Sequence, residues 1–302
     1  MDIVLATHHL SKSYGPHPAV IDLDLEVRRG EVFGFLGPNG AGKTTTIRMA
    51  LGLARPTRGR IEVLGRDLRT YGATVLPRVG ALIEAPALYG YLSGRDNLEA
   101  FASVLGGVSR TRLEEILELV GLRHRQRDRV STYSLGMKQR LGVAAALLHD
   151  PDLVVLDEPA NGLDPAGVVE MRELLRRLAQ GGKAVFISSH VLAEVQQICD
   201  RVAIVHRGRL VRLAPVAELL AGRDELEVQL EDTAAALALI RRQDWGASAR
   251  IEDGRLVTSP PPGGGRELLQ LLAGAERWPD TLTERRQNLE EIFLSLTGAA
   301  AS

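Results

Sequence analysis

The glycine-rich loop Gly37-Pro38-Asn39-Gly40-Ala41-Gly42-Lys43-Thr44-Thr45 sets the architecture that we expect for this 302-residue chain. It matches the pattern G-x-x-x-x-G-K-[ST], in which backbone N–H groups surround phosphate oxygens. Residues 31–36 before the loop have the pattern of a buried strand, and residues 45–51 after it have that of a helix. Strand, loop and helix together predict a phosphate-binding site.

The residue types in this loop suit phosphate chemistry. The glycines allow a tight turn and a close approach of the backbone to the ligand. Lys43 is placed to supply a positive charge to β- and γ-phosphates, and the Thr44 hydroxyl is placed to bind Mg²⁺. The helix that begins here adds the positive end of its dipole to the same anion.

Composition and charge exclude several function classes. The chain has 37 basic and 38 acidic residues, so no net field favours nucleic acid or an anionic membrane as the main partner. No signal peptide or membrane-spanning run is apparent, so we expect a cytoplasmic chain whose membrane role comes through a partner. Cys199 is the single cysteine and lies among apolar residues at helical spacing, which predicts a buried structural thiol.

The stretch from about 93 to 150 predicts a helical subdomain inserted in an α/β domain. Ser93 with Asp96, and Thr111 with Glu114, have the spacing of helix capping boxes. Ser134 is the expected cap of a further helix.

A strand–helix–strand rhythm follows and predicts a doubly wound, parallel sheet. The apolar run 153–156 ends in Asp157 and Glu158, and a strand over 184–188 leads to His190. Because ligands bind at the carboxyl ends of such strands, we expect both carboxylates beside the phosphate loop. Asp157 then helps to hold Mg²⁺, and Glu158 orients an attacking water.

The C-terminal part has another character. Strands are expected over 226–230, 247–251 and 255–258, and helices over 234–241, 267–273 and 289–296. We therefore predict a nucleotide-binding domain over 1–218 and a small α+β accessory domain over 219–302. No catalytic constellation is apparent in the second domain, which favours a role in regulation or dimer support.

A motif at the start of the Ser134 helix resembles the marker sequence of a known family of phosphate-loop ATPases. Tyr133-Ser134-Leu135-Gly136-Met137 resembles the L-S-G-G-Q signature of ATP-binding cassette (ABC) transporter ATPases, although the middle Gly and the final Gln are replaced. The resemblance implies a phosphate-loop NTPase core that binds ATP and Mg²⁺. It also implies a head-to-tail homodimer, in which Ser134 and Gly136 contact the γ-phosphate held by the opposite subunit.

Further positions match this family in order. Tyr14 corresponds to its adenine-stacking aromatic residue, and Asp164 lies in the loop that communicates across the dimer. His190 resembles the switch histidine that contacts the γ-phosphate. Glu158 takes the general-base role by the same resemblance.

The loop around Glu84 departs from the usual family pattern. Glutamate stands where a glutamine normally senses phosphate, metal and the membrane partner; it can ligate Mg²⁺ but cannot donate a hydrogen bond as an amide does. The pattern from Ile83 to Tyr89, I-E-x-P-x-x-Y, resembles that of bacitracin- and lantibiotic-resistance exporters.

We therefore expect an ATPase subunit on the inner face of the membrane that powers export of an antibiotic, a peptide or another hydrophobic compound through separate permease subunits. An importer remains an alternative. A soluble ABC ATPase that acts on ribosomes or DNA is a less favoured alternative. Members that act on ribosomes generally carry two cassettes and those that act on DNA carry a long insertion, whereas this chain has one cassette without such an insertion. A non-hydrolysing nucleotide sensor is disfavoured by the presence of Lys43, Asp157, Glu158 and His190.

Overall fold

The structure, a computed structural model, describes residues 2–220, 224–286 and 289–298. These residues form two compact units, one within 2–216 and 296–298 and the other within 217–295. The unit boundary lies two residues before the position expected from the sequence, 218, and the end of the last helix groups with the first unit.

A six-stranded sheet forms the centre of the first unit, in the order β10-β9-β3-β8-β7-β6. Its strands run parallel except for β10, which returns beside β9 through the turn at Arg207 and Gly208. Every residue of β3, β7 and β8 is buried, which explains their unbroken apolar sequences. The strands are β3 (Val32–Leu36), β6 (Val79–Leu82), β7 (Leu153–Asp157), β8 (Ala184–Ser189), β9 (Arg201–His206) and β10 (Arg209–Pro215).

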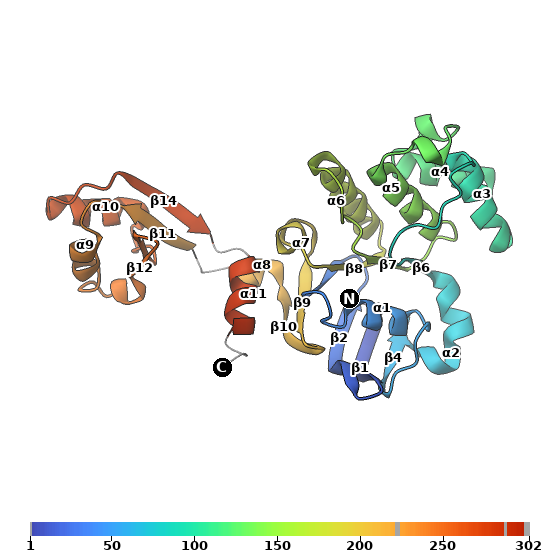
Figure 1. The fold of residues 1–302 in the computed structure, drawn as a ribbon, viewed down its shortest axis with the longest axis horizontal. Helices are drawn as coiled ribbons and strands as arrows, with labels where there is room; N and C mark the ends of the chain where they lie inside the picture. Colours follow the sequence, from blue (N-terminus) through green and yellow to red (C-terminus); the bar gives the residue numbers. More distant parts are fainter. Residues whose placement is uncertain (1, 221–223, 287–288, 299–302) are drawn as a thin grey trace. The chain divides into compact units, whose positions relative to one another are not determined.

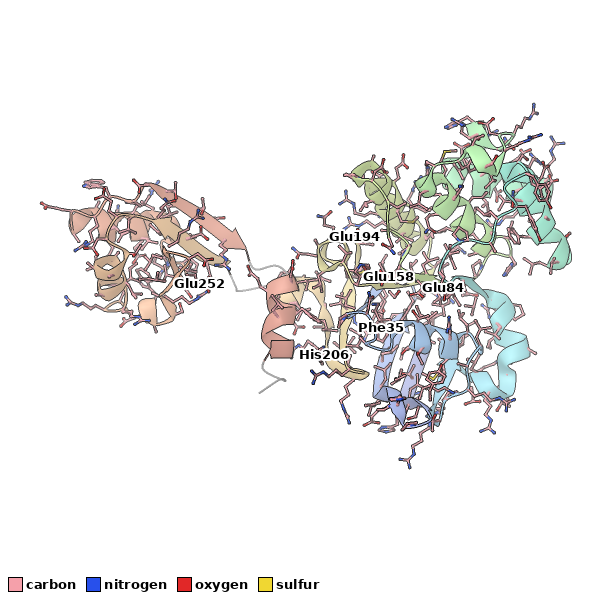
Figure 2. The ribbon with its side chains drawn as sticks, viewed as in Figure 1. Phe35, Glu84, Glu158, Glu194, His206 and Glu252 are labelled. Carbon is pink, nitrogen blue, oxygen red and sulfur yellow. The ribbon has the colours of Figure 1, made fainter. Side chains whose placement is uncertain are left out.

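Helices and a second sheet cover this central sheet on its two faces (Figure 1). On one face the rings of Phe33, Phe35 and Phe186 lie within an apolar core that the second, antiparallel sheet and α1 complete. Phe35 is labelled in Figure 2. On the other face a Cβ at Gly34 would lie 2.9 Å from the sulfur of Cys199. Burial raises the pKa of the Cys199 thiol, as expected for a structural cysteine. The covering elements are β1 (Ile3–Tyr14), β2 (His17–Arg28), β4 (Arg58–Val63), β5 (Arg66–Asp67), α1 (Lys43–Ala50), α6 (Pro165–Gln180) and α7 (Leu192–Ile198).

The predicted helical subdomain is present as α3 (Gly94–Val104), α4 (Arg110–Leu119) and α5 (Leu135–Ala146), which lie together in Figure 1. Ser93 caps α3, and Ser134 caps α5 by accepting the Met137 N–H, as predicted. The cap predicted at Thr111 is wrong. Ser109 caps α4 instead, because its hydroxyl accepts the Arg112 N–H.

Shorter elements link these layers. They are α2 (Leu68–Val75), α8 (Val216–Leu220) and the 3-10 turns η1 (Leu76–Arg78), η2 (Arg123–Arg125) and η3 (Val130–Thr132). No helix in the described part of the chain is long and apolar enough to cross a membrane.

The second unit is α+β, as the sequence predicted. Its antiparallel sheet has the order β12-β13-β11-β14, and an apolar core that includes Leu226, Val228 and Leu272 lies between sheet and helices. The strand predicted over 247–251 is wrong in its first half, because 246–248 form a 3-10 turn. The elements are β11 (Asp224–Gln229), α9 (Thr233–Ile240), η4 (Gly246–Ser248), β12 (Arg250–Glu252), β13 (Arg255–Thr258), α10 (Gly264–Gly274), β14 (Thr281–Arg286) and α11 (Leu289–Gly298).

Candidate active site

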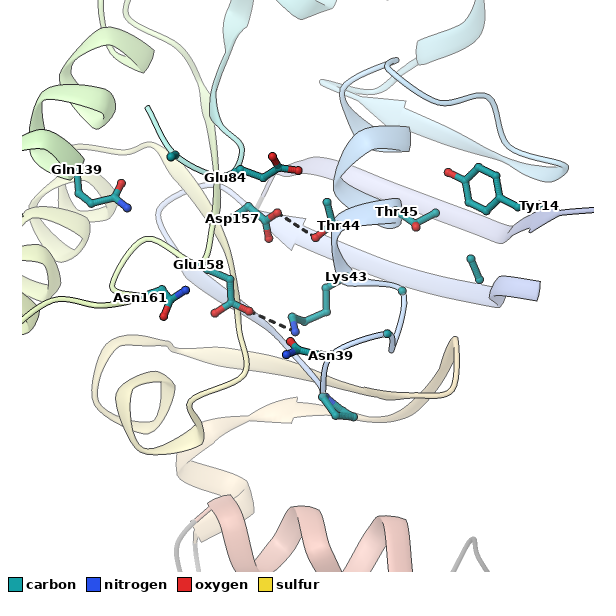
Figure 3. Close-up of a pocket in the computed structure, with 15 residues that line it drawn as sticks. Tyr14, Asn39, Lys43, Thr44, Thr45, Glu84, Gln139, Asp157, Glu158 and Asn161 are labelled. Atoms are coloured by element: carbon teal, nitrogen blue, oxygen red, sulfur yellow. Dashed lines mark hydrogen bonds and ion pairs between the residues drawn. The ribbon is translucent and has the colours of Figure 1, made fainter. Parts of the chain in front are cut away.

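A cavity of about 680 Å³ opens where β3 and β7 end. This size suits a small-molecule ligand, since such pockets typically enclose about 300–1,000 Å³. Tyr14 stands at one end of the cavity, and Gln139 and Asn161 stand at the other (Figure 3). Most of the residues predicted for nucleotide binding line it, namely Tyr14, Pro38, Asn39, Gly40, Gly42, Lys43, Thr44, Thr45, Glu84, Asp157 and Glu158.

The phosphate loop has the backbone that its glycines predict. Gly42 has a φ of 99° directly before α1, and a Cβ there would lie 2.4 Å from the carbonyl oxygen of Ala19. A Cβ at Gly37 would lie 2.5 Å from the carbonyl oxygen of Val205. Both positions therefore require glycine, and the loop leaves space for phosphate oxygens above its N–H groups. Gly37 and Ala41 belong to the loop but do not line the cavity.

Lys43 and Glu158 face each other across the cavity (Figure 3). The Lys43 Nζ lies 3.2 Å from Glu158 Oε1 and donates to the Gly37 carbonyl at 2.8 Å. The other Glu158 oxygen lies 2.8 Å from Nδ1 of His190, although His190 itself is outside the cavity lining. The predicted phosphate-binding cation, general base and switch histidine thus form one connected group.

Asp157 and Thr44 offer a pair of oxygen atoms for a cation. The Thr44 hydroxyl donates to Asp157 Oδ2 at 3.0 Å, and Asp157 is 5% exposed. A hydroxyl and a carboxylate are hard oxygen donors, which Mg²⁺ prefers, and Mg²⁺ commonly retains several waters beside one or two protein ligands. The residues present therefore fit a magnesium ion bound together with nucleotide phosphates.

Glu84 reaches the cavity from the loop after β6. Its backbone has a φ of 61°, and its carboxylate accepts a hydrogen bond from Arg48 Nη2 at 2.8 Å. Its predicted role as a metal ligand remains a prediction. In this structure the guanidinium of Arg48 neutralises the charge that distinguishes Glu84 from a glutamine.

Tyr14 is half exposed at the cavity edge, and Lys12 Nζ lies 4.9 Å from the centre of its ring. An exposed aromatic face at the rim is available for stacking against a planar base. Adenine stacking by Tyr14 stays a prediction.

Besides Gly37 and Ala41, three further predicted nucleotide-binding residues do not line this cavity: Ser134, Gly136 and Asp164. Ser134 and Asp164 cap α5 and α6, respectively. A Cβ at Gly136 would lie 3.7 Å from the Leu163 side chain, so the start of α5 and the 161–164 segment are neighbours. These residues therefore form a second group beside the cavity, as expected if they act on a nucleotide bound elsewhere.

Sequence reasoning missed several residues at the site. Gln139 and Asn161 line the cavity, Arg48 pairs with Glu84, and Ser188 is hydrogen-bonded to Asp157. Asn161 lies three residues before Asp164, in the loop that the family resemblance assigns to communication across the dimer, and that resemblance was a usable signal. Glu194 on α7 was also missed; burial, and secondarily the charge of Glu158, raises the pKa of its carboxyl group.

The fold and this site define a phosphate-loop ATPase. The family model described as ABC transporter matches residues 20–161. The chain is 45% identical over 303 residues to the bacitracin transport ATP-binding protein BcrA of Bacillus licheniformis, covering 99% of this chain and 98% of that protein. It is 38% identical over 309 residues to the daunorubicin resistance ATP-binding protein DrrA3 of Streptomyces coeruleorubidus, covering 98% and 96% of the respective chains.

Solved structures support the same assignment. CbiO1 of Clostridium perfringens, which is part of the ABC transporter complex cbiONQ, has a TM-score of 0.68 and 27% identity. The match covers 74% of this chain and 92% of CbiO1. The chain belongs to the ATP-binding subunits of ABC transporters. It binds nucleotide and hydrolyses ATP, and subunits of this class work with separate transmembrane permease subunits.

Proposed function

We propose that the chain powers export of an antibiotic, a peptide or another hydrophobic compound through separate membrane subunits. The observation that carries this proposal is the likeness to the bacitracin transport protein, which extends over 99% of this chain. It therefore includes the C-terminal unit and not the cassette alone. The likeness to a daunorubicin resistance protein covers 98% of this chain. Glu84, in a loop that resembles those of bacitracin-resistance exporters, supports the same proposal.

Hydrolysis in this site uses the pairs described above. Lys43 turns from Glu158 to the β- and γ-phosphates, and the freed Glu158 carboxylate accepts a proton from the attacking water. The water oxygen bonds to the γ-phosphorus, and the bond to the β-phosphate oxygen breaks to release ADP. His190 holds Glu158 in position and reaches the γ-phosphate.

Thr44 and Asp157 hold the magnesium ion in this proposal, and Glu84 contributes when Arg48 releases it. A magnesium ion held by these residues would supply positive charge against the negative charge that develops on the phosphate oxygens. The oxygen atoms of Thr44 and Asp157, 3.0 Å apart, support this assignment.

Two copies of the chain form the working ATPase in this proposal. Ser134, Gly136 and Asp164 lie outside the cavity of their own chain, which supports a role at the nucleotide of a second copy. ATP then holds the two copies together, and hydrolysis separates them. Residues 1–218 act as the nucleotide-binding domain, and 219–302 act as an accessory domain.

Affinity purification of Glu158→Gln from native cells, with ATP and Mg²⁺ in mild detergent, tests the transport assignment. We expect a polytopic membrane protein in stoichiometric amount, because the chain would be bound to it at the inner face of the cell membrane. Lys43→Met, purified in parallel, should retain less of it if nucleotide drives assembly. Recovery of ribosomes or nucleic acid without a membrane protein would contradict the export proposal.

A further inference from the structure

Ser188 contacts both Asp157 and Glu158, the two residues whose carboxylates have proposed catalytic roles. It lies on β8, directly opposite Asp157 of β7 in the parallel pair, and its side chain is fully buried. It does not line the cavity, so it is not placed to touch a nucleotide.

The Ser188 hydroxyl both donates and accepts a hydrogen bond. Its Oγ donates to Asp157 Oδ1, and it accepts the Glu158 N–H at 3.1 Å. Because Oδ1 is engaged by Ser188, the other oxygen, Oδ2, faces the Thr44 hydroxyl. One hydroxyl therefore fixes the carboxylate that is oriented toward the metal position.

The same hydroxyl helps to hold the general base. Glu158 has a φ of 52°, a left-handed backbone conformation that side chains other than glycine rarely adopt. Its N–H is held by both the hydroxyl and the carbonyl oxygen of Ser188, the latter at 3.2 Å. This conformation directs the Glu158 side chain toward Lys43 and His190.

We propose that Ser188 is a positioning residue for ATP hydrolysis. Its hydroxyl orients Asp157 toward the magnesium position and keeps Glu158 aimed at the attacking water. The proposal rests on the proposed catalytic roles of Asp157 and Glu158. Partners of this kind, one step removed from a metal, typically change metal affinity or activity by about 10–100-fold when removed.

Ser188→Ala and Ser188→Cys test the role of the hydroxyl. Alanine removes it, and cysteine fills the space with an S–H group that is a weak donor. For both variants we expect kcat to fall about tenfold. Mn²⁺ binding to protein loaded with a non-hydrolysable ATP analogue, followed by electron paramagnetic resonance, should weaken by a similar factor. Affinity for the analogue in EDTA should stay within about twofold of wild type, because Ser188 does not line the cavity.

Thr7→Val is the matched control. Thr7 is also buried, and its hydroxyl donates to the Leu23 carbonyl and accepts the Leu25 N–H, but it does not line the cavity. It should change thermal stability without changing Mn²⁺ affinity. If Ser188→Ala does not fold, Ser188→Cys decides the question. Wild-type kcat and Mn²⁺ affinity in Ser188→Cys would overturn the inference, whereas a wild-type protein without ATPase activity would contradict the catalytic proposal itself.

Discussion

Lys43 and Glu158 form an ion pair inside the nucleotide cavity, with Nζ 3.2 Å from Oε1 and the lysine side chain 7% exposed. Each partner is expected to act on a different part of ATP, so this contact has to open when nucleotide binds. In the proposed mechanism, nucleotide therefore replaces one charged partner of Lys43 with another. The exchange avoids leaving a buried ammonium group without a partner at any stage.

Lys43→Met should weaken nucleotide binding strongly. A hydrogen bond to a charged group contributes about 1.5–3 kcal/mol, so we expect affinity to fall about 10–100-fold, measured by fluorescence with a labelled ATP. Lys183→Met is a close control, because Lys183 also pairs with a carboxylate and a carbonyl, those of Asp150 and Pro151, but away from the cavity. Equal losses in both variants would show that Lys43 acts through folding alone.

Gly42→Ala should prevent the loop from closing around phosphate. The new Cβ would lie 2.4 Å from the carbonyl oxygen of Ala19, and the backbone φ of 99° is already unfavourable for alanine. We expect loss of nucleotide binding and a lower thermal midpoint. Gly182 has a similar φ of 83°, with open space where a Cβ would lie. Gly182→Ala should therefore lower the free energy of unfolding only by the penalty for a left-handed alanine backbone, about 1–2 kcal/mol. Nucleotide binding by Gly42→Ala at wild-type affinity would contradict this account of the loop.

Asp150 should contribute stability that depends on pH. Its hydrogen bond from Lys183 lowers the pKa of Asp150 despite partial burial, and the charges of Lys183 and Arg112 add to this effect. The folded pKa lies below the unfolded one, so the stabilisation is present at neutral pH and is lost as the pH falls through the folded value. Because the Asp150 side chain is 70% exposed, we expect less than about 1 kcal/mol.

Thermal unfolding of Asp150→Asn against pH measures this contribution. The variant should be slightly less stable than wild type at pH 7, and the difference should disappear at the acid end. Asp253→Asn is the control, because Asp253 has a similar left-handed φ, 47° against 53° for Asp150, in a different turn. A constant difference at every pH would contradict the assignment to Asp150 ionisation.

Local chemistry made much of the site predictable. The phosphate loop, Asp157 with Glu158, and the Ser134 cap each rest on residue types at short spacing, and the structure places them at the predicted strand end or helix start. The left-handed backbone of Glu158 was not predicted. Ser188 was not predictable in this way, because a serine in a buried strand has no local signature. Its contact with Asp157 depends on the register between β7 and β8, which are separated by a whole helix.

Strand β14, Thr281–Arg286, shows the same limit in the second unit. Its sequence, TLTERR, lacks the apolar alternation that marks a half-buried strand, so it was not predicted. Pairing with β11 specifies it instead, through opposite partners such as Glu225 and Arg285. The cap predicted at Thr111 failed for a different and local reason, since Ser109 offered an equivalent hydroxyl two residues earlier.

The most direct test of the central claim is the ATP turnover of Glu158→Gln beside its ATP affinity. The amide keeps the shape of the side chain but cannot accept the proton, so we expect ATP binding to be retained and turnover to fall about 10²–10⁴-fold. Glu173→Gln, on the exposed side of α6, should behave like wild type. Robust steady-state hydrolysis by Glu158→Gln would show that the proton leaves by another route, and would contradict the catalytic assignment.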